Sequence, residues 1–167
     1  MALLPIVYHP HPALHKIASP VTEFDKALKK LIEDMYETMY HANGVGLAAP
    51  QVAISKRIAV IDVSEDRTQP FCIINPEIIK KEGEEMMEAG CLSVPNTYDK
   101  VPRATKVIVR AQDVTGKFFD LEGSGLLGHC LQHEIDHLDG KLYIDYLSSL
   151  KRNLLIKKMQ KHLRQKK

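Results

Sequence analysis

The chain has 167 residues, of which 44% are hydrophobic and 26% are charged, and its formal net charge is +2. This length suits one domain with a sizeable core and is too short for two ordinary domains. No run of about 18 apolar residues occurs, which excludes a membrane-spanning segment. Three cysteines do not suit a disulfide framework, and residues 1–5 lack the basic flank and apolar run of a signal peptide. We therefore expect a protein of the reducing cytoplasm.

The first half of the chain is predicted to form one helix and two strands. Residues 25–41 carry apolar side chains at helical spacing, and residues 43–44 (Asn-Gly) close this amphipathic helix. Residues 57–63 and 71–74 contain apolar, β-branched runs of strand length. We expect residues 75–76 (Asn-Pro) to end the second strand.

The second half is predicted to form a hairpin followed by two helices. Residues 106–110 and 117–121 resemble paired strands around a glycine-containing turn. Residues 125–138 and residues 147 to about 164 have helical patterns, the second with a serine available as N-cap. Consecutive strands with little helix between them predict an α+β fold with antiparallel pairing.

The strongest chemical signal lies in the first of these two helices, where His133, Glu134 and His137 form a His-Glu-x-x-His pattern. Positions four apart lie on one helix face, about 6 Å along the axis, so the two imidazoles can bind one metal ion. Glu134 can then take a proton from a water whose pKa the metal lowers towards ~7. The alternative interpretation is a solvated helix that carries two histidines by chance.

A tetrahedral site with one water needs a third protein ligand. Cys130 is unsuitable because it precedes His137 by seven residues, which is about 10.5 Å along a helix, and His129 is farther still. Both are expected to pack beside the site. Cys91 is favoured because the glycine before it lets the backbone come close to a ligand. The alternatives are Asp136, Asp139 or a distant carboxylate.

Three motifs, in this order, resemble those of the peptide deformylases. Residues 44–51 (GVGLAAPQ) match the motif GxGLAAPQ, residues 90–93 (GCLS) match most of EGCLS, and residues 132–137 (QHEIDH) match QHExDH. The resemblance covers nearly the whole chain. It implies a bacterial-type enzyme that hydrolyses an amide and releases formate from the N-terminal formyl-methionine of newly made polypeptides. It also implies an α+β fold, with antiparallel sheets packed around a central metal-binding helix and with N-terminal and C-terminal helices.

The same resemblance implies a metal site formed by Cys91, His133 and His137, with water in the fourth position. Members of the family typically use Fe(II) and also work with nickel or cobalt, whereas their zinc forms are usually poor. We therefore expect one divalent metal, Fe(II) in the cell, with nickel, cobalt or zinc as the metals of a purified protein.

The implied reaction gives roles to three further groups. Glu134 would deprotonate the water on the metal, and the hydroxide would attack the formyl carbon. The side-chain amide of Gln51 and the backbone N–H of Leu92 would donate to the resulting oxyanion. Glu134 would then return the proton to the leaving amine.

Substrate-binding residues are the least specific part of the prediction. Gly46 would provide main-chain contacts to an extended peptide. The candidates for the methionine pocket are Val45, Met87, Leu126, His129 and Cys130.

Two positions depart from the family pattern. Ala89 stands where the family usually has a glutamate, and this loss would leave a nearby arginine, for which we take Arg103, without its usual partner. His129 falls where family pockets generally hold an apolar residue. We hypothesise that Ala89 and His129 reshape the methionine pocket and shift its preference for the first side chain. The alternative for His129 is that it rests on the helix surface.

The C-terminus is strongly basic. Residues 151–167 hold eight Lys or Arg and no Asp or Glu, which leaves 15 basic and 21 acidic residues elsewhere, a net charge of −6. We therefore divide the chain into a catalytic domain, residues 1–150, and a basic helical tail, residues 151–167. The tail is either a solvated helix end or a surface for ribosomal RNA, and RNA contact would weaken steeply with salt.

Two other functions remain to be weighed. A His-Glu-x-x-His metallopeptidase would cleave internal peptide bonds and usually has a His or Glu as third ligand, so the role of Cys91 separates the two enzymes. A non-enzymatic ribosome-binding factor would keep a metal for stability alone. The joint presence of Gln51, Cys91, Leu92 and Glu134 counts against that factor. The expected partners are N-formyl-methionyl nascent peptides and the ribosome, with no membrane.

Overall fold

A computed structural model describes residues 3–165. Met1 and Ala2 of the N-terminal segment, and Lys166 and Lys167 of the predicted tail, lie outside the described residues. The elements are η1 (Pro12–His15), α1 (Lys26–His41), β1 (Gly46–Ala48), η2 (Ala49–Val52), β2 (Ile58–Ile61), β3 (Phe71–Glu82), β4 (Glu85–Cys91), β5 (Val94–Arg103), β6 (Lys106–Gln112), β7 (Phe118–Ser124), α2 (Gly125–Leu138), η3 (Tyr143–Tyr146) and α3 (Ser149–Gln165), where η is a 3-10 helix.

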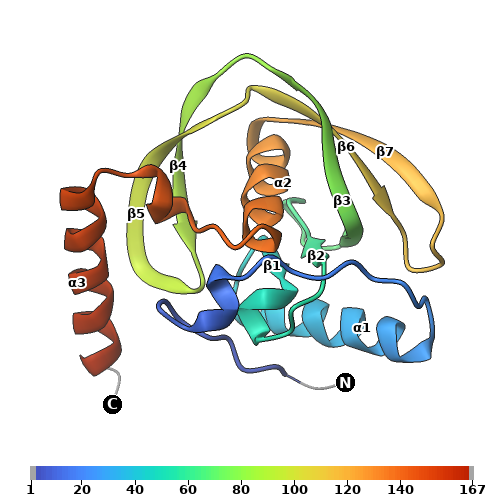
Figure 1. The fold of residues 1–167 in the computed structure, drawn as a ribbon, viewed down its shortest axis with the longest axis horizontal. Helices are drawn as coiled ribbons and strands as arrows, with labels where there is room; N and C mark the ends of the chain where they lie inside the picture. The colour runs from blue at the N-terminus through green and yellow to red at the C-terminus, as the bar shows by residue number, and fades with distance from the viewer. Residues whose placement is uncertain (1–2, 166–167) are drawn as a thin grey trace.

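The strands form two antiparallel sheets, one of five strands in the order β1-β2-β3-β6-β7 and one of two strands, β4-β5. Figure 1 shows α2 in the middle of the molecule, with the β4–β5 hairpin on one side of it and β3, β6 and β7 on the other. The apolar face of α2 packs with residues of the larger sheet in the first core cluster. The α+β fold with sheets around a central helix is therefore confirmed. No helix within residues 3–165 combines the length and the apolar character needed to cross a membrane.

The helices form where local sequence signals place them. Asp25 caps α1, because its Oδ1 accepts a hydrogen bond of 3.0 Å from the backbone N–H of Leu28. Ser148 caps α3, because its Oγ accepts a hydrogen bond of 3.3 Å from the backbone N–H of Lys151. The face of α1 that packs in the second core cluster, with β1 and β2, consists of Leu28, Ile32, Met35 and Met39.

The expected end of β3 at Asn75-Pro76 is wrong. The strand continues to Glu82, and its register against β6 shifts between Ile74 and Glu77, as in a β-bulge. Asn75 has a φ of 50°, and its side chain both accepts from and donates to the backbone of Val21, at 2.8 and 2.9 Å. A bulge tolerates a proline because the ladder is already interrupted there.

The β4–β5 hairpin and the short strand β1 are absent from the sequence-based prediction. β4 and β5 pair from Glu85 with Arg103 to Cys91 with Val94, so Cys91 stands at the turn of the hairpin. The hairpin packs on η3 and α3 in the third core cluster, where Met159 of α3 is 1% exposed. The basic helix thus contributes to the core that supports Cys91, and the predicted boundary at residue 150 falls in its first turn.

Candidate metal centre

Three potential metal ligands converge between α2 and the turn of the β4–β5 hairpin. His133 and His137 lie one helical turn apart, with their Nε2 atoms 3.1 Å from each other. The Sγ atom of Cys91 is 3.3 Å from Nε2 of His137, and all three ligand atoms lie within 4.8 Å of one another. Nitrogen and sulfur ligands of one tetrahedral ion stand about 3.3–3.6 Å apart. The three side chains therefore fit a single ion with a fourth position open.

The protonation states of these side chains also suit a cation. Burial lowers the pKa of His137 to about 3 and holds that of His133 well below its usual value, so both imidazoles keep free lone pairs at neutral pH. Burial also raises the pKa of the Cys91 thiol to about 12. A thiolate at Cys91 therefore needs a positive charge beside it, which a divalent ion supplies.

Glu134 lies next to this cluster and has few partners. Its side chain is 3% exposed, and Oε1 has no hydrogen-bond partner among residues 3–165. Burial raises its pKa to about 8, and the nearby Arg103 opposes this rise. Gly46 of β1 packs directly on the carboxylate, since a Cβ added at Gly46 would lie 2.4 Å from Oε2. A buried carboxyl with a pKa near neutrality can both take and return a proton.

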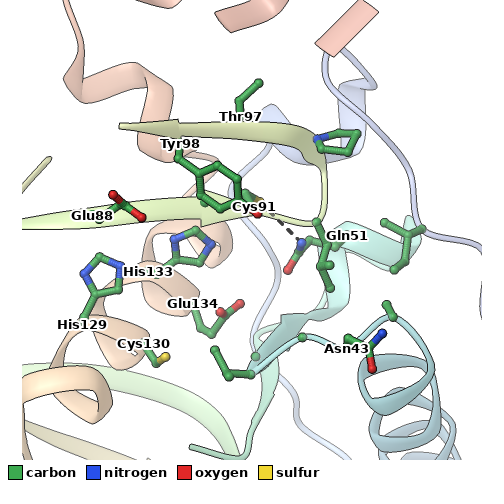
Figure 2. A pocket seen from close by; sticks show the side chains of 18 of the residues that line it. Asn43, Gln51, Glu88, Cys91, Thr97, Tyr98, His129, Cys130, His133 and Glu134 are labelled. Carbon is green, nitrogen blue, oxygen red and sulfur yellow. Dashed lines mark hydrogen bonds between the residues drawn. The ribbon is translucent and has the colours of Figure 1, made fainter. Parts of the chain in front are cut away.

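Gln51 is fixed so that its amide nitrogen points at the sulfur ligand (Figure 2). Its Oε1 accepts from the N–H of Ala48 at 3.0 Å. Its Nε2 donates to Oγ of Ser93 at 3.2 Å and lies 3.7 Å from Sγ of Cys91. Leu92, between Cys91 and Ser93, lines a cavity beside the three candidate ligands. Both predicted oxyanion donors thus come from segments that border the ligand cluster.

A cavity of about 530 Å³ opens onto the cluster and contains most of the predicted substrate-binding residues. Those that line it are Val45, Gly46, Leu126, His129 and Cys130. Met87 is not among the lining residues. Side chains alternate between the two faces of a strand, and Glu88 lines the cavity in its place. The cavity is also bordered by Glu88, Asn43 and Tyr98, which were not among the predicted substrate-binding residues. Recognising β4 as a strand would have placed Glu88 on the same face as Gly90.

His129 does not rest on an open helix surface. Its side chain is 8% exposed, and its ring stacks on that of His133 with centroids 6.3 Å apart and planes 29° apart. Burial, with a smaller effect of Arg103, lowers its pKa to about 4. The imidazole of His129 is therefore a neutral polar group in the wall of the cavity.

Ala89, in contrast, does not line the cavity. It is 1% exposed and packs in the third core cluster, on the face of the hairpin that also carries Arg103. Arg103 forms an ion pair with Asp136, since its Nη1 lies 2.7 Å from Oδ2, and its guanidinium lies over the ring of Tyr146. Its Nε and Nη2 atoms are buried with no hydrogen-bond partner among the described residues. Nδ1 of His137 is also buried with no hydrogen-bond partner among the described residues.

Two imidazoles, one thiol, a carboxyl group of raised pKa and an adjoining cavity together define a candidate mononuclear metal site equipped for amide hydrolysis. Comparison with known proteins identifies the family. The model of the polypeptide deformylase family matches residues 3–153. The peptide deformylase of Hahella chejuensis is 54% identical over 162 residues, which cover 96% of both chains. That of Chromobacterium violaceum is 51% identical over 165 residues, 99% of both chains.

Solved structures agree with this match. The crystal structure of a peptide deformylase from Legionella pneumophila superposes with a TM-score of 0.97 at 52% identity and covers 99% of this chain and 98% of that chain. The chain therefore belongs to the polypeptide deformylase family and is an enzyme, which confirms the family expected from the three motifs. Membership and fold support the deformylation of nascent peptides as its general activity.

Proposed function

We propose that this chain hydrolyses the formyl group from N-terminal formyl-methionine, with one divalent metal ion held by Cys91, His133 and His137. The convergence of these three ligand atoms beside the buried carboxyl of Glu134 carries the proposal. A metallopeptidase of the same helical motif usually has a His or Glu where this cluster has Cys91, which favours the deformylase activity.

In the proposed reaction, an ion held by Cys91, His133 and His137 would act as a Lewis acid and would lower the pKa of the attacking water to about 7. Glu134 accepts the proton of the attacking water and later delivers it to the leaving amine. Nε2 of Gln51 and the backbone N–H of Leu92 donate to the formyl oxygen as the carbon becomes tetrahedral. One such donor is worth about 2.7–4 kcal/mol of barrier.

We propose that the substrate peptide lies along β1. This strand is at the edge of the larger sheet, so one side of its backbone is free to pair with an extended peptide. Gly46 in β1 lines the cavity together with Val45, Leu126 and Cys130. The first side chain of the substrate would enter this cavity while the formyl group reaches the ligand cluster.

We propose Fe(II) as the metal and the cytoplasm as the compartment. A thiolate with two imidazoles also suits zinc, nickel or cobalt, so the donor set alone leaves the metal open. Anaerobic purification followed by elemental analysis measures the bound metal directly. Iron in stoichiometric amount is the expected result, and another metal in its place would contradict the iron proposal.

The activity is tested by formate release from a formyl-Met tripeptide, with Glu134→Gln as the diagnostic variant. We expect release by the unchanged chain and a loss of at least about 100-fold in the variant, since general acid–base catalysis contributes 10²–10⁴-fold. The variant should retain its metal, because Glu134 is outside the ligand cluster. Release that survives in the metal-loaded variant would remove Glu134 from its role, and cleavage of internal peptide bonds would favour the peptidase.

We also propose that the basic face of α3 contacts ribosomal RNA. Lys157, Lys158 and Lys161 are exposed on this helix. Deleting the helix would remove the buried Met159 from the core, so charge reversal of the three lysines to Glu is the cleaner test. Ribosome affinity at low salt should fall and lose much of its salt dependence. Unchanged affinity in a folded variant would contradict this contact.

A further inference from the structure

His129 continues the line of metal-centre histidines along α2. It precedes His133 by four residues, so it stands on the same helix face, about 6 Å further along the axis. Its ring stacks on that of His133 and lines the cavity (Figure 2). In a formylated peptide, the first Cα is only two bonds from the formyl carbon, so the first side chain begins beside the formyl group. With the formyl group at the ligand cluster, the end of the first side chain therefore lies within reach of His129.

The hydrogen-bonding state of His129 is restricted by its surroundings. Nδ1 is fully buried and has no hydrogen-bond partner within residues 3–165. A neutral imidazole carries one N–H and one lone pair, and buried N–H groups without a partner are rarer than acceptors without one. This places the lone pair on Nδ1 and the hydrogen on Nε2. Because Nδ1 is enclosed, the part of the ring left to face the cavity is the side that carries Nε2.

We infer that His129 is a specificity-determining residue whose Nε2–H donates a hydrogen bond to a heteroatom in the first side chain of the formylated peptide. This inference rests on the proposed deformylase function. The sulfur of methionine is a weak acceptor, and an apolar chain of equal length would displace water from the N–H without offering it a partner. The cavity therefore distinguishes a heteroatom from a methylene group at the δ position, which a purely apolar wall cannot do.

The experiment compares three formyl tripeptides that differ only in that δ atom. The first residue is methionine (sulfur), norleucine (methylene) or O-methylhomoserine (ether oxygen, the stronger acceptor). The measured quantity is kcat/KM for formate release. We expect the ratio of O-methylhomoserine to norleucine to fall about tenfold on His129→Leu, the worth of one hydrogen bond. With methionine as first residue, the ratio to norleucine should fall less, because sulfur accepts weakly.

Two amide variants locate the donor. The side-chain nitrogen of His129→Gln can occupy the place of Nε2, so this variant should retain the preference for the ether oxygen. His129→Asn carries its amide at the place of Nδ1 and should lose the preference. Leu126→Ala, in the same cavity, enlarges the cavity without changing a donor and should alter all three substrates in parallel.

The outcomes separate this inference from the proposed function. Formate release by the unchanged chain with a ratio that His129→Leu leaves intact would retain the deformylase function and overturn the role of His129. Equal ratios in the Gln and Asn variants would also overturn it. Absence of formate release from every peptide, with metal bound, would overturn the function and the inference together.

Discussion

The position of Glu134, the proposed base, depends on a neighbouring glycine that has no side chain. Gly46 leaves room for the carboxylate of Glu134, and any Cβ at this position would collide with Oε2 at 2.4 Å. The collision forces the carboxylate to move when the glycine is replaced, and this carboxylate is the group proposed to transfer the proton.

Gly46→Ala is therefore expected to lower kcat/KM for the formyl-Met peptide by about 100-fold, the effect of misplacing a reacting group by about 1 Å. The bound metal should be unchanged. Gly125→Ala is the matched control: its φ is +56° but no atom lies within 4 Å of an added Cβ, so it should cost stability and leave kcat/KM unchanged. Equal kcat/KM in the Gly46 variant and the unchanged chain would contradict the prediction, since it would show that the displaced carboxylate of Glu134 still acts as the base.

At this scale, the sequence predicted which candidate ligands converge better than it predicted the surroundings of those residues. Helical spacing excluded Cys130 from the ligand set, and the structure brings Cys91 to His133 and His137 instead. Spacing along one element is fixed by the geometry of a helix. The environment of Arg103 depends on which residues face it across the hairpin, and this register cannot be read from a single chain.

At the scale of elements, Asp62 connects three segments at the end of β2. Tyr40 of α1 donates to its Oδ2 at 2.5 Å, and the N–H of Ser64 donates to its Oδ1 at 2.9 Å. The backbone N–H of Asp62 donates to the carbonyl of Val45 at 2.9 Å. Arg67 donates to the carbonyls of both Asp62 and Gly44. This cluster holds the loop that leads into β1 and the cavity.

The cluster predicts a pH-dependent contribution to stability. Burial by itself raises the pKa of Asp62, but hydrogen bonds from Ser64 and Tyr40 and the charge of Arg67 outweigh it, so the pKa lies below its usual value. A lowered carboxyl pKa stabilises the fold above the unfolded-state pKa of about 3.9, and this contribution disappears as the pH falls through the folded-state pKa. Asp62→Asn should therefore lower Tm at pH 7, and its difference from the unchanged chain should shrink below about pH 4.

Thermal unfolding followed across pH 3–8 measures this difference. Asp66→Asn removes the same charge from an exposed position in the same loop and serves as the control. A Tm difference for Asp62→Asn that stays constant down to pH 3 would contradict the assignment of the effect to the ionised carboxylate.

The elements that the sequence predicted are those with local signals. The bounds of α2 agree with the prediction because a turn and a glycine mark its ends, and α1 has a capping aspartate. β4 has no such signal, since its charged and methionine side chains resemble a solvated segment until β5 pairs with it. β3 passes through Pro76 because the tertiary contact between Asn75 and Val21 stabilises the bulge.

At the scale of the whole molecule, the candidate metal site connects two separately packed regions. Cys91 belongs to the hairpin of the third core cluster, whereas α2 packs its apolar face in the first core cluster. An ion that binds all three ligands therefore ties the β4–β5 hairpin to the larger sheet through α2 (Figure 1). A ligand that binds only the folded arrangement raises the free energy of unfolding.

Removal of the metal by a chelator should lower Tm and remove the connection between the β4–β5 hairpin and α2. Backbone amide hydrogen exchange should accelerate more in β4 and β5 than in β2 and β3, because β2 and β3 of the larger sheet remain packed in the second core cluster. Cys91→Ser, with metal offered at the same concentration, should shift both readouts in the same direction. A uniform change in exchange over all strands would show instead that the ion stabilises the molecule without a preference for the hairpin.

The global arrangement was predictable only in outline. The order of predicted elements gave the α+β class, and the three motifs gave the family and the central helix. The insertion of β4 and β5 between the paired strands β3 and β6 was not predictable, because it depends on pairing between distant residues. This insertion places the cysteine opposite the histidines.

The order of the candidate ligands along the chain has a consequence during translation. Cys91 leaves the ribosome about 40 residues before His133, which at 5–20 residues per second is about 2–8 s. Over that interval, its thiol has the ordinary reactivity of an unfolded cysteine and is open to oxidants. Docking of α2 brings Cys91 to His133 and His137, where a bound ion would occupy the thiolate. Cys91 should therefore be more open to oxidants in chains still being made than in the folded, metal-loaded protein.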